Sequence, residues 1–176
     1  MKYLFKSSRL GFRNWNAEDL APMTEINADP EVMEFFPKCP NKNETSEFIQ
    51  RMSKQFDKNG FCYFAVDLLE TQEFIGFIGI SEQTYEAEFT PCVDIGWRIS
   101  RNHWYKGYAT EGAKACLEFA KKKTGLTEIL SVAPVINTKS EAVMKKIGMQ
   151  KVSTFLHSLL KDHPELQECV LYSIKI

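Results

Sequence analysis

The chain has 176 residues, of which 44% are hydrophobic and 26% are charged, and its formal net charge is −1. This length and composition favour one domain, residues 1–176, with a packed core, and they argue against a disordered chain. Lys and Arg form no basic block, so we expect neither a nucleic-acid groove nor a polybasic membrane surface as the main function.

The cysteine and histidine patterns argue against a disulfide framework and a metal site. The five cysteines are odd in number and contain no Cys-x-x-Cys pair, and the three histidines share no metal-ligand spacing. The N-terminus has no apolar run typical of a signal peptide, and no segment is long enough to span a bilayer. We therefore expect a cytoplasmic protein with reduced thiols.

The first half of the chain begins with a strand or hairpin and continues with helical segments and two strands. Asn16 is a typical N-cap, Pro30 starts a short helical turn, and Pro37 stops it. The polar residues 81–90 are expected to form a connection. The expected ranges are a strand or hairpin over 3–15, helical segments over 17–27, 29–36 and 45–57, and strands over 61–69 and 74–80.

The second half alternates strands and helices, and Asn137 is again a typical N-cap. The order of elements predicts a mixed α/β chain around one sheet, with helices on both faces. The expected ranges are strands over 93–99, 128–132, 149–156 and 169–174, and helices over 107–123 and 138–146.

The turn between the strand over 93–99 and the following helix is expected to bind an anion. It carries Lys106 and Gly107, and the first N–H groups of the helix have no partner within the helix. These groups and the helix dipole favour a phosphate, although a plain connection is the alternative. The turn has neither the P-loop motif nor Gly-x-Gly-x-x-Gly, so ATP and NAD are not favoured.

A second segment gives this turn a context. Residues 131–149 read Ser-Val-Ala-Pro-Val-Ile-Asn-Thr-Lys-Ser-Glu-Ala-Val-Met-Lys-Lys-Ile-Gly-Met, with Asn137 and Ser140 after a strand. Together with Gly-Trp-Arg-Ile at 96–99 and Trp-Tyr-Lys-Gly-Tyr-Ala-Thr-Glu at 104–111, this segment resembles the GNAT acetyltransferase superfamily, and more closely its RimJ/RimL-like branch. The resemblance covers nearly the whole chain.

The resemblance implies the GNAT fold, a single mixed, mostly antiparallel, splayed sheet with helices on both faces. It also implies acetyl-CoA as co-substrate, with the pantetheine arm along residues 97–100 as an added strand and the pyrophosphate on the turn at 105–110. Lys106 and Lys146 would meet CoA phosphates, unless they are merely solvated. The cofactor-binding residues implied in this way are Trp97, Arg98, Ile99, Tyr105, Lys106, Gly107, Tyr108, Ala109, Thr110, Asn137, Ser140 and Lys146.

The resemblance further implies that an amine attacks the thioester carbonyl directly. A backbone N–H near Arg98 or Ile99 would stabilise the oxyanion. Asp94 is the nearest carboxylate for a general base, with a structural carboxylate in a polar network as the alternative. An α-amine needs only a weak base, because about one-tenth of it is neutral at pH 7, against roughly one part in two thousand of a lysine amine.

Two positions depart from the family pattern. Met144 stands where many GNAT enzymes place a tyrosine as general acid, and Ser140 is the remaining hydroxyl on that helix, either as substitute acid or as a capping residue. Tyr105 stands where the branch commonly has Gly. A positive φ would strain Tyr105 by about 1 kcal/mol, so we expect an ordinary backbone there and an outward-facing ring.

A few further residues are candidates for the acceptor side. His157 and His163 lie in a loop that borders the acceptor site in the family, as a base, as peptide contacts or as solvated residues. Phe35, Phe36 and Pro37 are candidates for the wall of the acceptor cleft, with a core position as the alternative. The acceptor itself is not identified, because acceptor-side residues lie on loops.

The expected function is transfer of an acetyl group from acetyl-CoA to a primary amine in a ternary complex. The amine is either a protein N-terminal α-amine or a small molecule. A CoA-binding module with weak or no turnover is the alternative, which Met144 favours. The expected partners are acetyl-CoA and an amine acceptor, without nucleic acid, membrane or metal, and a homodimer is left open.

Overall fold

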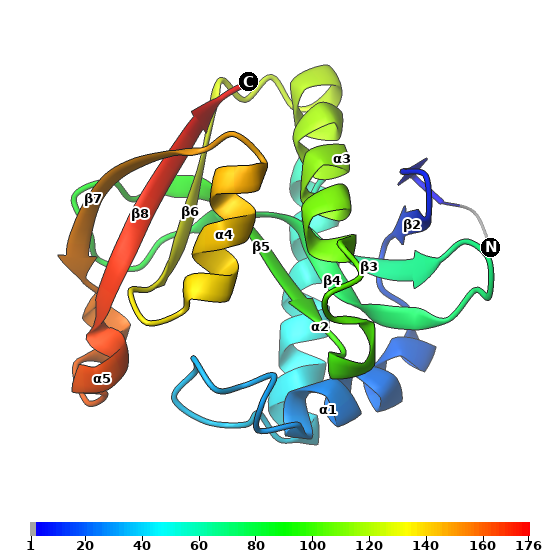
Figure 1. Ribbon diagram of the computed structural model, residues 1–176. Helices are drawn as coiled ribbons and strands as arrows, with labels where there is room; N and C mark the ends of the chain where they lie inside the picture. Colours follow the sequence, from blue (N-terminus) through cyan, green and yellow to red (C-terminus); the bar gives the residue numbers. More distant parts are fainter. Residues whose placement is uncertain (1–2) are drawn as a thin grey trace.

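The computed structural model describes residues 3–176 around an eight-stranded sheet with the strand order β1-β2-β3-β4-β5-β6-β8-β7 (Figure 1). Neighbouring strands are antiparallel except β5 and β6, which are parallel. The predicted mixed, mostly antiparallel sheet is confirmed. The strands are β1 (Phe5–Lys6), β2 (Leu10–Arg13), β3 (Tyr63–Leu68), β4 (Phe74–Gln83), β5 (Cys92–Ile99), β6 (Glu128–Pro134), β7 (Gln150–Leu156) and β8 (Glu168–Lys175).

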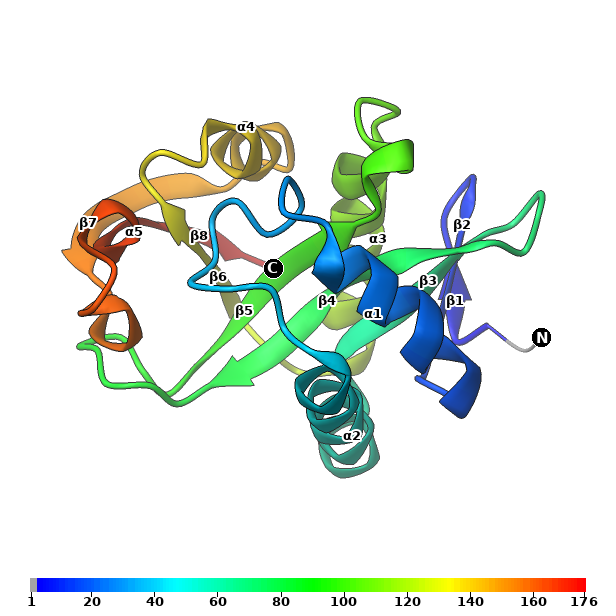
Figure 2. The same ribbon diagram turned by 90° about the horizontal axis from the view of Figure 1, so that it is seen from below.

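Helices cover both faces of the sheet, as predicted. Figure 2 shows α3 and α4 on one face and α1 and α2 on the other, with the α1–α2 loop running across β5. None of the helices within residues 3–176 is both long and apolar enough to cross a membrane. The helices are α1 (Leu20–Ala28), α2 (Lys42–Asn59), α3 (Tyr108–Lys123), α4 (Thr138–Lys146) and α5 (Pro164–Gln167), with 3-10 turns at Ala17–Asp19, Arg101–His103 and Ser158–Leu160.

Capping boxes set the starts of the early helical segments. Asn16 accepts a bond from the chain that follows it, while Asp19 accepts the Asn16 N–H at 2.8 Å. Asn41 and Glu44 form the same reciprocal pair before α2. Because this box begins the helix ahead of its apolar face, α2 starts at Lys42, three residues before the predicted start at 45.

The short helical turn predicted over 29–36 is a turn in the structure, and the range predicted after β4 needs correction. The segment 29–36 forms consecutive turns with one i to i+4 bond, from the Met33 N–H to the Asp29 carbonyl at 3.1 Å. Pro37 follows at once, so the helix cannot propagate beyond its first turn. Residues 81–83 were predicted to begin a connection, but they continue β4 because they pair with β5.

Stacked aromatic rings hold the N-terminal hairpin against α3. The ring of Phe5 stacks on Phe12 with centroids 4.4 Å apart and on Phe119 of α3 with centroids 4.5 Å apart. Such pairs add to the gain from burying the rings themselves. The hairpin predicted within residues 3–15 is confirmed, and its turn is held near the start of α3.

The sheet opens between β5 and β6. Asp94 and Leu130 are the register pair that joins these strands, and the Ser131 hydroxyl donates to the Ile95 carbonyl at 3.0 Å. From Gly96 onward, β5 is paired with β4 along one edge, and its other edge faces an opening. This opening is the feature of the fold that positions the candidate site.

Candidate active site

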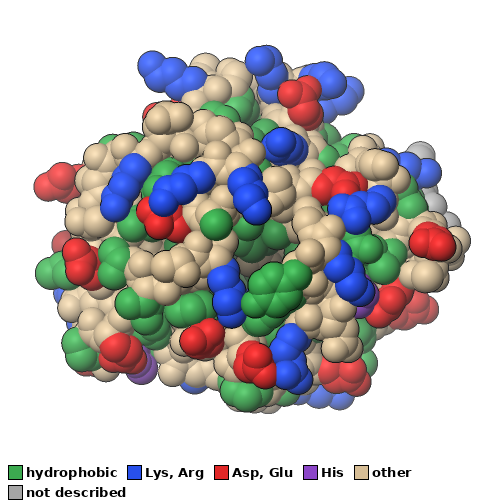
Figure 3. Space-filling model, in the orientation of Figure 1, with side chains coloured by type: hydrophobic (Ala, Val, Ile, Leu, Met, Phe, Trp, Pro, Cys, Tyr) green, Lys and Arg blue, Asp and Glu red, His purple; other side chains and the backbone are tan. Residues whose placement is uncertain are grey.

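Two cavities meet at the open edge of β5. The small cavity, of about 490 Å³, lies between β5 and the starts of α3 and α4. The large cavity, of about 810 Å³, is enclosed by β4, β5, α2, the α1–α2 loop and the segment after β7. Figure 3 shows the hollow between α3 and α4, with Lys and Arg side chains gathered over α4. The residues common to both cavities are Phe35, Phe36, Trp97, Arg98, Asn137 and Ser140.

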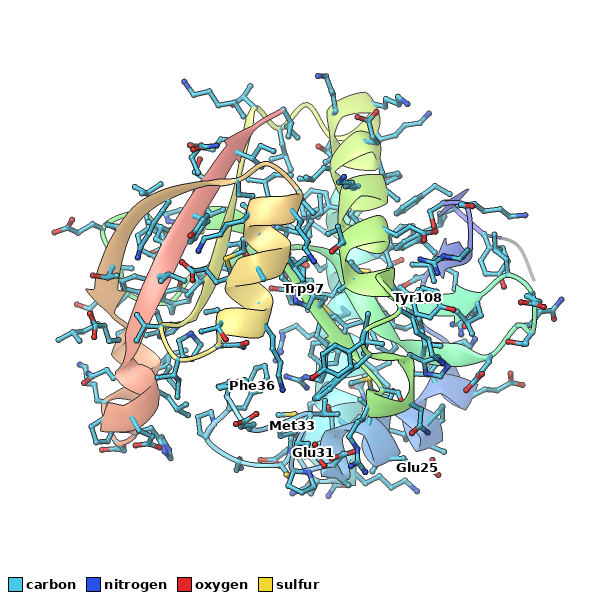
Figure 4. All side chains as sticks on the ribbon, in the orientation of Figure 1. Glu25, Glu31, Met33, Phe36, Trp97 and Tyr108 are labelled. Carbon is cyan, nitrogen blue, oxygen red and sulfur yellow. The ribbon has the colours of Figure 1, made fainter. Side chains whose placement is uncertain are left out.

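The junction of the cavities is formed by side chains from β5, the α1–α2 loop and the start of α4. Figure 4 shows Trp97 between α3 and α4, and Phe36 below them on the α1–α2 loop. Phe36 is 40% exposed despite its size. A solvent-exposed aromatic side chain at the junction of two cavities is available for contact with a ligand.

The backbone of β5 alternates between its partner strand and the opening. The Ser100 N–H donates to the Ile75 carbonyl at 2.9 Å, so Ser100, and Arg98 two residues before it, direct their backbone groups toward β4. Ile99 faces the other way, because its carbonyl accepts the Trp104 indole N–H at 2.8 Å.

This alternation distinguishes between the two predicted oxyanion donors. The Ile99 N–H points into the opening, whereas the Arg98 N–H is directed at Phe77, its register partner in β4, and is not available. By the same alternation, Trp97 presents both its N–H and its carbonyl to the opening. The free edge therefore offers the backbone pattern that an added extended chain needs.

Tyr105 adopts a left-handed backbone with a φ of 59°. The expectation of an ordinary backbone at this position is wrong, because the chain reverses tightly here before entering α3. A β-carbon in this region costs about 1 kcal/mol. The ring is 89% exposed, so the expectation of an outward-facing ring is confirmed.

The start of α3 leaves backbone donors without partners. Gly107, with a φ of 81°, precedes the helix and supplies no side-chain cap. The Glu111 N–H bonds to the Gly107 carbonyl at 3.0 Å, so the N–H groups of Tyr108, Ala109 and Thr110 precede the first helical bond. All three residues line the small cavity. The anion site predicted at this turn therefore has its donors in place.

Each of the predicted cofactor-binding residues except Lys106 lines the small cavity. Lys106 lies outside it. Lys139 and His103 are among the further residues that line the cavity, and the Lys139 Nζ lies 4.9 Å from the centre of the Trp104 ring. Lys139 and Lys146 bring positive charge to the α4 side of the small cavity.

Arg9 holds the turn from the N-terminal hairpin. Its Nη2 donates to the Lys106 carbonyl at 3.0 Å, its Nε donates to Glu111 at 2.7 Å, and its guanidinium lies 4.5 Å from the centre of the Tyr108 ring. Burial alone would raise the pKa of Glu111, but the bonds from Ser7 and Arg9 lower it. The sequence offered no local signal for this contact, since Arg9 and Glu111 are 102 residues apart.

Asn137 and Ser140 meet at the start of α4. The Asn137 Oδ1 accepts the Ser140 N–H at 3.1 Å as the helix cap, which leaves the Asn137 Nδ2 as the donor for a ligand. Ser140 caps through its backbone, so its hydroxyl is not needed for the cap. Both residues lie where the cavities join.

A family model described as an acetyltransferase (GNAT) domain matches residues 9–150. The chain belongs to the GNAT acetyltransferase family. It is 30% identical to the uncharacterized N-acetyltransferase YnaD of Bacillus subtilis over 160 residues, which cover 89% of this chain and 88% of that relative. The family membership predicted from the sequence is confirmed, and the chain is an acetyltransferase.

Solved structures share the GNAT fold over nearly the full length. A GNAT-family acetyltransferase from Bacillus anthracis superposes with a TM-score of 0.78 at 27% identity, over 97% of this chain and 96% of that one. RimL, a ribosomal L7/L12 alpha-N-protein acetyltransferase in complex with coenzyme A, superposes with a TM-score of 0.78 at 12% identity, over 99% and 98%. At such identity the second likeness shows the fold alone.

In this GNAT protein, Asp94 lies in the large cavity within a polar network. The Tyr63 hydroxyl donates to Asp94 Oδ1, and the Gln83 Nε2 donates to the same oxygen at 3.0 Å. Gly96 leaves room for the Tyr63 ring, since a β-carbon there would lie 3.2 Å from it. Burial raises the pKa of Asp94 to about 6, and the bonds from Tyr63 and Gln83 oppose the rise.

The two candidate histidines differ in position. His157 lines the large cavity and stacks on Tyr85 with ring centroids 4.2 Å apart. Its Nδ1 accepts the Leu159 N–H at 3.2 Å, so the proton of the neutral ring is on Nε2, and burial lowers its pKa. His163 lines neither cavity and lies 3.7 Å from Glu165. Neither histidine presents a free basic nitrogen to the cleft.

The remaining candidates lie in the wall of the large cavity. Phe35, Phe36 and Pro37 all line it and none is buried, which excludes the core alternative. Met144 also lines the cavity and is 1% exposed. Its thioether cannot donate a proton. Of the two hydroxyl residues of α4, Ser140 lines both cavities and Thr138 lines neither.

Proposed function

We propose that this GNAT protein transfers the acetyl group of acetyl-CoA to a primary amine by direct attack in a ternary complex. The observation that carries the proposal is the junction of two cavities at the unpaired edge of β5. The small cavity takes the acetyl-CoA and the large cavity takes the amine. Two reactants held at one junction need no covalent enzyme intermediate.

Three features of the small cavity fit acetyl-CoA. The free N–H groups at the start of α3 suit the pyrophosphate, and the outward backbone of Trp97 suits the pantetheine amides. Lys139 and Lys146 suit the phosphates as point charges. The coenzyme A bound in RimL, which has the same fold, supports this ligand.

Residues of the junction supply the chemistry. Asp94, through a water molecule, accepts the proton that the amine loses as its nitrogen attacks the thioester carbonyl carbon. The Ile99 N–H donates to the carbonyl oxygen as it becomes an oxyanion. The tetrahedral intermediate then collapses and the carbon–sulfur bond breaks. The Ser140 hydroxyl passes a proton to the leaving thiolate while it takes up another from water, and Asp94 returns the amine's proton to the solvent, so both groups end as they began. The products are an N-acetyl amide and free CoA.

We place the reaction in one domain of residues 1–176 and in the cytoplasm. The sheet runs from Phe5 to Lys175, so both ends of the chain contribute strands to it. The five cysteines are free thiols, which fits a reducing compartment.

Thiol release from acetyl-CoA tests the proposal. We expect free CoA to form at a rate that depends on the amine when the protein is mixed with acetyl-CoA and a panel of amines, amino acids and peptides. Tight binding of CoA without amine-dependent thiol release across the panel would support the CoA-binding module instead. No change in thermal stability on adding CoA would contradict both functions.

Arg9→Ala tests how the turn is positioned. We expect the Kd for CoA to rise roughly three- to tenfold, because the turn loses the contacts that pre-organise its N–H groups. Isothermal titration with CoA measures the change. Lys122→Ala is the matched control, since Lys122 pairs with Glu118 on the surface of α3 and lines neither cavity. An unchanged Kd in Arg9→Ala would show that the turn holds its shape unaided.

A further inference from the structure

Four charged side chains line the large cavity, namely Arg51, Glu82, Asp94 and Arg98. Glu82 pairs with Lys58 at 3.2 Å, and Asp94 is bonded by neutral donors. Arg51 and Arg98 form no ion pair with any carboxylate in residues 3–176. With Glu82 paired, two guanidinium groups and one carboxylate remain without an ion-pair partner, so the balance of unpaired charge in the large cavity is positive.

Arg98 is held by a neutral oxygen in place of a carboxylate. Its Nη1 donates to the Asn27 Oδ1 at 2.7 Å. Asn27 is 1% exposed, and its Nδ2 donates at 2.9 Å to the Thr45 hydroxyl, which donates at 2.9 Å to the Asn41 carbonyl. This relay turns the amide oxygen, and not its nitrogen, toward Arg98. The guanidinium is thus oriented but not neutralised.

Aromatic rings enclose the same guanidinium. It lies 4.3 Å from the centre of the Phe36 ring and 5.4 Å from that of Phe77, and its Nε–H is enclosed without an acceptor among the described residues. Burial lowers the pKa of Arg98 to about 10, so the group remains charged at neutral pH. A charged group with a vacant donor in a poorly solvated pocket favours an anion strongly.

We propose that the acceptor carries an anionic group, a carboxylate in the simplest case, beside its amine, and that Arg98 binds this group. The inference rests on the proposed acetyl transfer. Arg98 and Asp94 lie on the same face of β5, four residues apart, and both line the acceptor cavity. An amine near Asp94 and an anion at Arg98 orient the acceptor across the junction. A polycationic acceptor would instead place an ammonium near an unmatched guanidinium.

Binding of matched aromatic probes to the CoA-saturated protein tests the proposal. Phenylacetate, phenylacetamide and phenethylamine share a ring that suits the aromatic walls and differ in charge. We expect phenylacetate to bind at least about tenfold more tightly than phenylacetamide in isothermal titration, the difference that one charge-assisted bond supports. Equal binding, no binding of the carboxylate, or preference for phenethylamine would overturn the proposal.

Four variants locate the anion site. Arg98→Gln should abolish the preference for the carboxylate. Asn27→Asp should abolish it too, with the guanidinium still present, because the protein then supplies the matching carboxylate. Arg101→Gln, just beyond β5, should leave the preference unchanged. A preference that survives in Arg98→Gln, or that is lost only in Arg51→Gln, would overturn the role of Arg98.

Rates of thiol release with different acceptors show whether the anion is a free amino-acid carboxylate or a peptide side chain. They also distinguish failure of the anion site from failure of the proposed acetyl transfer. We expect L-phenylalanine to be a better acceptor than L-phenylalaninamide if the anion is a free amino-acid carboxylate. A peptide amide with Asp in second place should exceed its Asn counterpart if the anion is a peptide side chain. In either case Arg98→Gln should remove the advantage. Thiol release without any carboxylate advantage would refute only the anion site, whereas carboxylate binding without thiol release would refute only the transfer.

Discussion

Asp94→Asn is expected to lower the kcat of acetyl transfer about 100- to 10,000-fold, the range that general-base catalysis contributes. The substitution keeps an oxygen that can accept the Tyr63 hydroxyl and removes the proton-accepting charge. The affinity for CoA should change little, because Asp94 lines the acceptor cavity and not the small one. Steady-state thiol-release kinetics and titration with CoA measure the two quantities separately.

The pH dependence of kcat/KM tests the same role of Asp94. The base form of Asp94 predominates above its pKa of about 6, so kcat/KM should fall about tenfold per pH unit below that value. The titration of the amine acceptor affects the wild type and the variant alike. The ratio of kcat/KM in the wild type to that in the variant therefore reports the titration of Asp94 alone. This ratio should rise with pH up to about pH 6 and stay constant above it.

Tyr63→Phe is the companion variant. It removes a donor that stabilises the Asp94 carboxylate, so the pKa of Asp94 should rise and the acid limb of the profile should move to higher pH. A carboxylate with a purely structural role would leave the limb in place in this variant. Full activity of Asp94→Asn at pH 7.5 would assign the base to water or to the acceptor itself.

Arg13→Met is expected to lower the free energy of unfolding by about 3–5 kcal/mol. Arg13 of β2 bonds Asp19 at 2.7 and 2.8 Å and Asp67 of β3 at 2.7 and 2.8 Å. All three residues are buried, with exposures of 6%, 2% and 0%. Methionine fills a similar length but leaves two buried carboxylates without a cation. Urea unfolding followed by circular dichroism measures the loss.

Lys122→Met is the matched control for this variant. Lys122 pairs with Glu118 at 3.4 Å on the surface of α3, where both side chains are about two-thirds exposed. Such a pair contributes little, so the free energy of unfolding should stay almost unchanged. A loss below about 1 kcal/mol in Arg13→Met would show that water or rearrangement compensates the two carboxylates.

The proposed CoA side of the site comes from two short stretches of sequence, and for that reason the sequence predicts most of the residues that line the small cavity. Alternating β-formers from Val93 to Ile99 lead through a glycine-containing turn into a helix, and the free N–H groups at the start of that helix follow from backbone geometry. Asn137 signals a helix start by its type alone. The sequence does not predict the left-handed backbone of Tyr105, because residues with a β-carbon rarely adopt the positive φ that the tight turn imposes.

The acceptor side could not be predicted, because its contacts join distant residues. Tyr63 reaches Asp94 across 31 residues, and Asn27 reaches Arg98 across 71. The pairing of β5 with β4 decides that the Ile99 N–H points into the opening and that the Arg98 N–H points toward β4. No single stretch of chain carries these relations.

The sequence by itself determined the α/β class, the family and the place of the glycine-containing turn before α3, because periodicity, caps and turns act within a few residues of one another. The tertiary structure alone decided that β5 separates from β6, that Arg9 holds the turn, and that Arg98 stands unmatched in the acceptor cavity. These features depend on which side chains packing brings together and on which charges it leaves without a partner, and both are properties of the folded chain.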